Sequence, residues 1–258
     1  MLINSVILIL REVLEAGLIV TVLLALSQTL QLSKSWLITA LLLGFASATL
    51  YALNIQTISL ALEGVGQEVF NATIHIVLCA AIALFVFNMK DHQNSQHIRF
   101  IMIACVALAI TREGSEIIIY IQGLMGIPDL VYPVLAGSII GAGIGLSIGV
   151  FFYYLIANIS FNKGLKLGLF LLILIAGGMM MQTTQLLIQA DLIISQQALW
   201  NTSSLISERS LIGQLLYALI GYEATPTAIQ VCAYLSSVII MIFLSMRALR
   251  HFKQRERQ

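Results

Sequence analysis

Two copies of one charged pattern, R-E-x-x-E, stand inside long apolar runs of the sequence. In a helix the two glutamates of each copy share one face, and the arginine can pair with the second glutamate four residues on. Carboxylate oxygens suit hard cations such as ferric iron, calcium, magnesium and manganese. The copies predict one cation site made of Arg11, Glu12, Glu15, Arg112, Glu113 and Glu116.

The position of these charges makes a purely structural role a weaker interpretation. Each charged side chain inside a bilayer costs about 2.5–3.5 kcal/mol on insertion scales. At 1.5 Å rise per residue, Arg11 lies about 12 Å and Arg112 about 16 Å from the same predicted membrane surface. The two motifs can therefore meet on antiparallel helices. Two alternatives stay open, namely an ion-pair network that only fixes packing and a site that carries protons alone.

Composition identifies the elements that must hold this site. Of 258 residues, 59% are hydrophobic and only 10% are charged. This is too little polar surface for a soluble domain. The net charge of +1 gives no reason to expect a nucleic-acid partner. Cys79, Cys105 and Cys232 lie singly in apolar runs and are expected to be buried packing residues. We expect an all-α polytopic protein whose main partner is the lipid bilayer.

Hydropathy predicts seven transmembrane helices, since each needs about 20 apolar residues. They are Ile3–Leu30, Trp36–Leu53, Val69–Met89, Ile98–Gly123, Val131–Ile159, Leu165–Ile188 and Ala228–Leu249. Seven spans place ten basic residues on one side: Lys34, Lys90, Arg99, Lys163, Lys166, Arg247, Arg250, Lys253, Arg255 and Arg257. The other side holds Arg209 and several acids. The positive-inside rule then puts the N-terminus outside and the C-terminus in the cytoplasm, in the cytoplasmic membrane of the cell.

An internal duplication explains the two motifs, which are 101 residues apart. The same shift relates the small residues Ala40, Gly44 and Ala48 to Gly141, Gly145 and Gly149. Two three-helix repeats, about 1–90 and 97–190, would then have inverted topology, as in many transporters. An external loop 189–227, a last helix 228–249 and a basic tail 250–258 complete one transmembrane domain spanning 1–258.

At these motifs the chain resembles the iron permease family, which includes fungal ferric permeases and bacterial elemental-iron uptake permeases. The resemblance extends to Leu199–Ser204 and Gly221–Pro226, which resemble the family's external tryptophan segment and its entry to the last span. It implies an iron transporter rather than an enzyme, with the four motif glutamates as iron ligands and no prosthetic group. It also implies a separate oxidase or periplasmic iron-delivery protein. Val13 departs from the family pattern, which usually has glycine there.

Several further polar residues are weaker candidates. Glu68 and His75 share one helix face with Asn71 at the predicted outer end of a span, and Glu63 precedes them. A polar stripe near another span end includes Gln182 and Gln185. These accessory positions could equally be helix caps or interhelical hydrogen bonds. The alternative functions are transport of manganese or lead, or a membrane oxidoreductase subunit. The oxidoreductase is disfavoured because no Glu-x-x-His pattern occurs.

Overall fold

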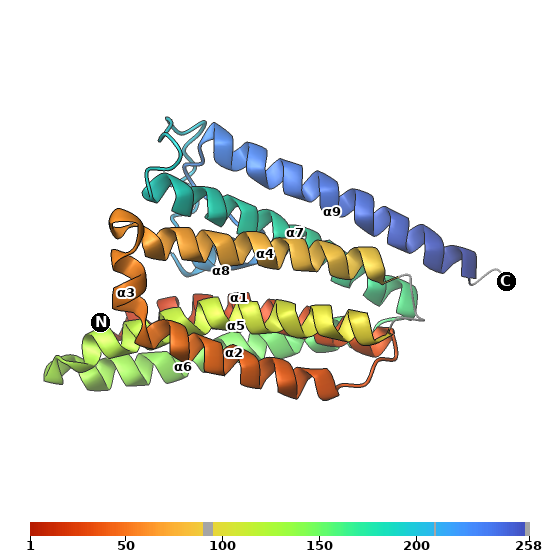
Figure 1. The fold of residues 1–258 in the computed structure, drawn as a ribbon, viewed down its shortest axis with the longest axis horizontal. Coiled ribbons are helices and arrows are strands. Elements are labelled where there is room, and N and C mark those ends of the chain that lie inside the picture. The colour runs from red at the N-terminus through yellow and green to blue at the C-terminus, as the bar shows by residue number, and fades with distance from the viewer. Residues whose placement is uncertain (90–94, 209, 256–258) are drawn as a thin grey trace.

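The computed structural model is a bundle of long helices (Figure 1), and it describes residues 1–89, 95–208 and 210–255. Apart from one isolated bridge between Ala198 and Thr227, the described residues form helices, turns and loops. The elements are α1 (Leu2–Thr29), α2 (Ser35–Leu53), α3 (Ile55–Leu60), η1 (Leu62–Gly64), α4 (Gly66–Asn88), α5 (Ser95–Met125), α6 (Pro128–Ala157), α7 (Phe161–Gln189), α8 (Leu211–Ile220) and α9 (Ala228–Arg255).

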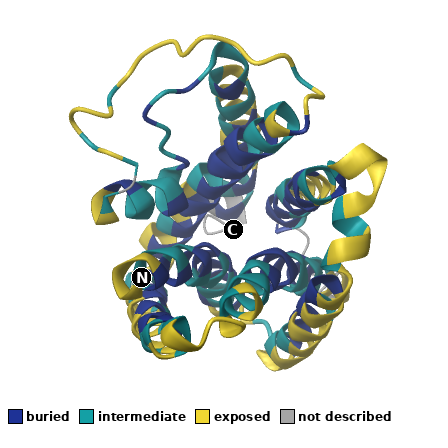
Figure 2. Cartoon of the chain, turned by 90° about the vertical axis from the view of Figure 1, so that its left-hand side faces the viewer, coloured by how far each residue is buried: buried dark blue, intermediate teal, exposed yellow. Residues whose placement is uncertain are grey.

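The long helices follow from uninterrupted apolar sequence. Within the described residues, α2, α4, α6, α7 and α9 are long and apolar enough to cross a membrane. Helices α1 and α5 have 28 and 31 residues, and each carries one R-E-x-x-E motif in its apolar run. Large hydrophobic side chains such as Phe45, Ile139 and Phe243 are exposed on the outside of the bundle. Figure 2 shows buried residues facing the middle of the bundle and exposed residues facing outward, as expected of a polytopic membrane protein.

The long helices form two layers (Figure 1). A four-helix layer contains α1 packed along α6 and α2 packed along α5, and a three-helix layer contains α4, α7 and α9. Close packing within the four-helix layer depends on small residues. A Cβ on Gly141 would lie 2.5 Å from the backbone oxygen of Val6, and one on Gly44 would lie 2.7 Å from Cβ of Ile110. The predicted small-residue rows therefore lie at helix contacts.

The connections differ more from the prediction than the long helices do. Residues 189–227, predicted as a loop, contain the helix α8, which packs against α1 and α7. The α2–α4 connection contains α3 and η1, so α4 begins at Gly66 rather than at Val69. Helix α9 continues to Arg255, beyond the predicted end at Leu249 and into the predicted tail. Three of the basic residues that predict the orientation in the membrane lie outside the described residues, namely Lys90, Arg209 and Arg257. Residues 256–258 of the predicted tail also lie outside them.

Candidate metal site

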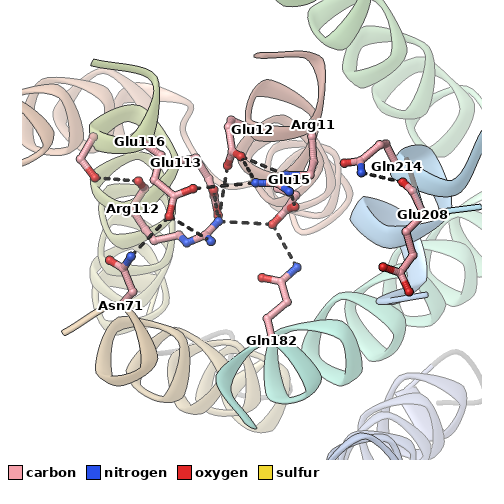
Figure 3. Close-up of polar contacts among 11 residues, drawn as sticks. Arg11, Glu12, Glu15, Asn71, Arg112, Glu113, Glu116, Gln182, Glu208 and Gln214 are labelled. Atoms are coloured by element: carbon pink, nitrogen blue, oxygen red, sulfur yellow. Dashed lines mark hydrogen bonds and ion pairs between the residues drawn. The ribbon is translucent and has the colours of Figure 1, made fainter. Parts of the chain in front are cut away.

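Helices α1 and α5 bring the two R-E-x-x-E motifs into direct contact at the boundary between the layers (Figure 3). The Nη1 atom of Arg112 lies 3.5 Å from Oε2 of Glu12 and 3.6 Å from Oε2 of Glu15. The same nitrogen pairs with Glu113, and Nη2 lies 3.2 Å from Oε1 of Glu116. One guanidinium thus contacts all four motif carboxylates. The structure thus brings the two motifs together, while their depth in the membrane stays a prediction.

Arg11 braces the same cluster from α1. It pairs with Glu12, and its Nε lies 3.8 Å from Oε1 of Glu15. Its Nη2 reaches Oε2 of Glu116 on α5 at 4.0 Å. The guanidinium also lies over the ring of Tyr217 on α8, with its Cζ 5.5 Å from the ring centroid. A cation–π contact of this kind holds the arginine toward the carboxylates.

Three of the four glutamates are placed to share one ion. Oxygen atoms of Glu12, Glu113 and Glu116 lie within 4.8 Å of one another, and we call these residues the carboxylate trio. Glu12 and Glu113 are buried, while the side chain of Glu116 is 22% exposed. Glu15 belongs to the ion-pair network but is not part of this trio. With all six charged groups ionised, the cluster carries a net charge of −2.

Neutral side chains from the three-helix layer orient two of these carboxylates. Asn71 on α4 donates from Nδ2 to Oε1 of Glu116 at 3.3 Å, and Tyr51 donates to Oδ1 of Asn71 at 3.1 Å. Gln182 on α7 donates from Nε2 to Oε2 of Glu15 at 3.2 Å. Hydrogen bonds to a charged acceptor are stronger than neutral ones. Each layer therefore contributes to the site, the four-helix layer with charges and the three-helix layer with amides.

A wide cavity of about 340 Å³ reaches the cluster from the end of the bundle that holds the N-terminus. Glu12 and Glu116 form part of its wall, together with Arg11 and Asn71. Its other lining residues are Leu8, Gln67, Glu68, Ile119, Tyr120, Leu186 and Gln189. Two members of the carboxylate trio are thus accessible from this cavity.

A second, much smaller pocket of about 20 Å³ lies on the other side of the cluster. Glu15 and Glu113 line this small pocket, with His75 from α4 and Gln182 from α7. Tyr217 and Ala218 of α8 and Ile19, Ile175, Gly178 and Met179 complete its wall. The motifs run in opposite directions on antiparallel helices. One glutamate of each motif therefore faces the wide cavity and the other faces the small pocket.

Comparison with known protein families decides what kind of protein carries this arrangement. A family model described as "Iron permease FTR1 family" matches residues 2–256, nearly the whole chain. The chain belongs to the iron permease FTR1 family. It is therefore an iron permease or transporter in general terms, and a multi-pass membrane protein. Comparisons with curated proteins and with solved structures give no significant match.

The accessory residues predicted for this permease lie at different places. Glu68 lines the wide cavity, and its Oε2 has no hydrogen-bond partner. His75 and Gln182 line the small pocket. Gln185 is half-buried on α7. Glu63 is exposed on η1 with a φ of 62°, at the surface of the connection that precedes α4. The structure thus brings His75 and Gln182 to the motifs and leaves Glu63 at the surface.

Sequence reasoning missed α8 and its Tyr217 as parts of the site. Signals for this helix were present in the sequence. Ser210 caps its first turn by accepting a hydrogen bond from the backbone of Gly213 at 3.0 Å, and Gly221 ends it in a left-handed conformation with φ 67°. The helix has only 10 residues, too few for a membrane span, so its interval was assigned to the external loop.

Segments that resemble the family's external motifs pair beside α8. The backbone N–H of Leu199 donates to the carbonyl of Pro226 at 2.8 Å, and that of Thr202 donates to the carbonyl of Ala224 at 2.9 Å. Glu208 accepts from the backbone N–H of Ala224 at 2.7 Å. These bonds tie the connection before α8 to the one after it, and so fix the position of the helix that closes the small pocket.

Proposed function

We propose that this protein imports iron across the cytoplasmic membrane, binding it at the two R-E-x-x-E motifs. The observation that carries the proposal is the carboxylate trio at the wall of the wide cavity, with oxygens within 4.8 Å of one another. Oxygen atoms at this spacing can replace part of an ion's hydration shell. A divalent ion would cancel the net charge of −2 on the ionised cluster, and a trivalent ion would leave +1.

Arg112 is central to the binding step because it already pairs with the carboxylates that iron would use. Its guanidinium contacts Glu12, Glu113 and Glu116. A metal ion and this guanidinium therefore compete for the same oxygens. We propose that iron displaces Arg112 from the trio, and that Arg112 holds the negative charges when iron has left. Leaving several carboxylates buried without a counter-ion would be strongly unfavourable.

We propose that seven helices span the membrane, α1 and α5 included, with the N-terminus outside. Six described basic residues lie toward one end of the bundle, which supports this orientation. They are Lys34, Arg99, Lys163, Lys166, Arg247 and Arg250. Helix packing supports the inverted repeat. In the predicted repeats α1 corresponds to α5, α2 to α6 and α4 to α7. The contact between α1 and α6 therefore corresponds to the contact between α5 and α2, and both are observed. The contact between α4 and α7 corresponds to itself.

Alternating access then involves the two layers rather than the two sequence repeats. The tightly packed pairs α1–α6 and α2–α5 each join one helix from each repeat, so a motion of whole repeats would separate glycine-packed backbones. The site itself lies between the four-helix layer and the three-helix layer. We propose that rocking of these layers closes the wide cavity and opens the small pocket toward the cytoplasm.

The proposed substrate and partners follow from the same chemistry. Iron is the transported substrate, with no prosthetic group required for a carboxylate site. Delivery in a suitable oxidation state would come from a separate oxidase or periplasmic iron-binding protein. The acidic residues at the wide-cavity end, such as Glu68 and Asp129, support cation collection there.

Uptake of radioactive iron into liposomes that contain only this protein tests the proposal. Single replacements of each trio member by glutamine keep side-chain size and remove charge. We expect each to reduce uptake to background while the protein remains inserted. Glu63→Gln is the matched control, because Glu63 is an exposed acid on η1, and uptake should persist. Undiminished uptake in all three trio variants would refute the site. Stronger inhibition by manganese than by excess unlabelled iron would refute iron as the preferred cargo.

A further inference from the structure

Three polar atoms at the small pocket lack a hydrogen-bond partner. They are Nδ1 of His75, Oε1 of Glu15 and Oε1 of Gln182. The three residues come from α4, α1 and α7, and their exposures are 1%, 9% and 6%. Nε of Arg11 lies 3.8 Å from Oε1 of Glu15 without a hydrogen bond, so the atoms that the charged network leaves aside are Nδ1 of His75 and Oε1 of Gln182. Buried polar groups in proteins nearly always have a partner, so Nδ1 of His75 and Oε1 of Gln182 at one cavity point to a bound species that supplies one.

The small pocket is the next position along the helices after the carboxylate trio. Glu15 follows Glu12 by three residues on α1, and His75 follows Asn71 by four residues on α4. At 1.5 Å per residue these steps are about 4.5 and 6 Å along the bundle. Glu113 belongs to the trio and also lines the small pocket. Nη1 of Arg112 pairs with both Glu113 and Glu15, so an ion in the pocket has to displace this guanidinium and draw the side chains together. An ion leaving the trio away from the wide cavity reaches this pocket first.

The volume of the pocket limits what can occupy it. At about 20 Å³ it holds one water-sized particle, since a water molecule needs roughly 10–15 Å³ on this measure. A metal ion fits there only after losing its own hydration shell. Magnesium loses its water reluctantly and calcium takes 6–8 oxygen ligands. A small site with few donors is therefore unfavourable for both ions.

We infer that the small pocket is a second cation station, at which Nδ1 of His75 binds a divalent first-row transition-metal ion together with the carboxylates of Glu15 and Glu113. This inference rests on the proposed iron transport and adds a selectivity step to it. Imidazole nitrogen suits iron, zinc, copper and nickel, whereas magnesium and calcium prefer oxygen ligands. The trio attracts hard cations in general, and the station passes on those that accept a nitrogen ligand. The amide oxygen of Gln182 is a fourth donor.

Ligand spectroscopy of wild-type protein tests the station without a substitution. Protein loaded anaerobically with Fe²⁺ is measured by X-ray absorption at the iron edge. Outer-shell scattering from an imidazole ring is expected in wild-type protein and in His251→Gln, and it is lost in His75→Gln. His251 is the matched control because its Nδ1 also lacks a partner, but it lies near the end of α9. An oxygen-only shell in wild-type protein overturns the inference and leaves a bridging water as the occupant.

Transport by the same variants separates this inference from the proposed function. Uptake of Fe²⁺ into liposomes is measured against increasing calcium and magnesium. His75→Gln should weaken apparent iron affinity by about tenfold or more and make both ions better competitors. His75→Asn provides a second test if the first variant is unstable. An unchanged competition profile in inserted His75 variants overturns the station, while loss of uptake in Glu12→Gln still supports the trio. Full uptake by Glu12→Gln contradicts the proposed function itself.

Discussion

The wide cavity and the small pocket share the helices α1, α4, α5 and α7, and α8 adds to the small pocket alone, yet the two differ in volume, closure and hydrogen bonding. Each receives one glutamate from each motif. The wide cavity has a volume of about 340 Å³ and the small pocket about 20 Å³. Asn71 at the wide cavity is hydrogen-bonded on both sides, whereas His75, one turn further, has an unpartnered Nδ1. The charged cluster is therefore accessible from one end and closed at the other.

Helix α8 accounts for much of this difference, because Tyr217 and Ala218 cover only the small pocket. Two glycines allow the close approach of α8 to α7. A Cβ on Gly221 would lie 2.3 Å from Cα of Gly178, and Gly178 itself lines the pocket. A short helix between α7 and α9 thus closes one face of a site that α1, α4, α5 and α7 build. In the rocking that we propose the layers would move, and α8 would provide part of the closure.

Charge removal on the two sides of the cluster should have different consequences. Glu116→Gln removes a trio ligand at the wide cavity, so we expect loss of both equilibrium iron binding and uptake. Glu15→Gln leaves the trio complete, so binding should remain within about tenfold of wild type while uptake is lost. Equilibrium binding of radioactive iron to purified protein and uptake into liposomes provide the two measurements. Equal loss of binding in both variants would remove the distinction between the two positions.

Chemical accessibility should differ between the two regions in the absence of metal. The thiol of Gln67→Cys, in the wide cavity, should react with a membrane-impermeant thiol reagent, whereas that of Met179→Cys at the small pocket should be protected. Reactivity requires an accessible thiolate. Cys232, an exposed native thiol, is first replaced by serine. Labelling is followed by mass spectrometry, and rapid reaction at both positions would show that the small pocket is open.

A substitution at the α7–α8 contact should weaken the closure of the small pocket. In Gly221→Ala the new methyl group meets Gly178 and the positive φ of 67° becomes unfavourable, with a combined cost of about 1–3 kcal/mol. We expect a lower thermal midpoint and faster labelling of Met179→Cys. Gly123→Ala is the matched control, since its Cβ would have nothing within 4 Å. Equal midpoints for both alanine variants would remove α8 as the cause of closure.

The smallest expected effect is a pH dependence at the connection that holds α8. Burial and then the neighbouring Glu208 raise the pKa of Glu223 to about 7 from its ordinary 4.5. The folded connection thus favours protonated Glu223. The contribution of Glu223 to the stability of the folded connection is complete below pH 4.5 and is lost as the pH rises through 7. Limited proteolysis between Leu199 and Pro226 should be faster at pH 8 than at pH 5.5, relative to an unfolded substrate. Glu223→Gln should remove this difference, and an unchanged difference would contradict the assignment.

The long helices and the meeting of the motifs were predictable because both depend on strong sequence signals. Seven apolar runs predicted the long helices to within four residues at each end, except that α9 continues six residues past Leu249. The depth estimate placed Arg11 and Arg112 together. The sequence could not show which three of the four motif glutamates lie close together. Spacing puts both glutamates of a motif on one helix face, but it does not show how α1 is rotated about its axis relative to α5. The role of α8 was missed because a 10-residue apolar helix has no membrane-span signature. Its capping residues, Ser210 and Gly221, were the available signal.

The arrangement of the helices in two layers could not be predicted from the repeat. A shift of 101 residues identifies equivalent helices, but it does not say which helices pack together. Tight contacts of Gly141 with α1 and of Gly44 with α5 join the repeats across the bundle. The moving unit that we propose therefore differs from the repeat that the sequence predicts.

Iron uptake by liposomes that contain only this protein is the most direct test of the central claim, that the two motifs form an iron-transport site. Ferrous and ferric iron are supplied separately to wild-type protein and to a Glu12→Gln/Glu116→Gln double variant, with insertion verified for both. We expect uptake by wild type and none by the double variant, and the preferred oxidation state will show whether an oxidase must act first. Equal uptake by the two proteins would contradict the account.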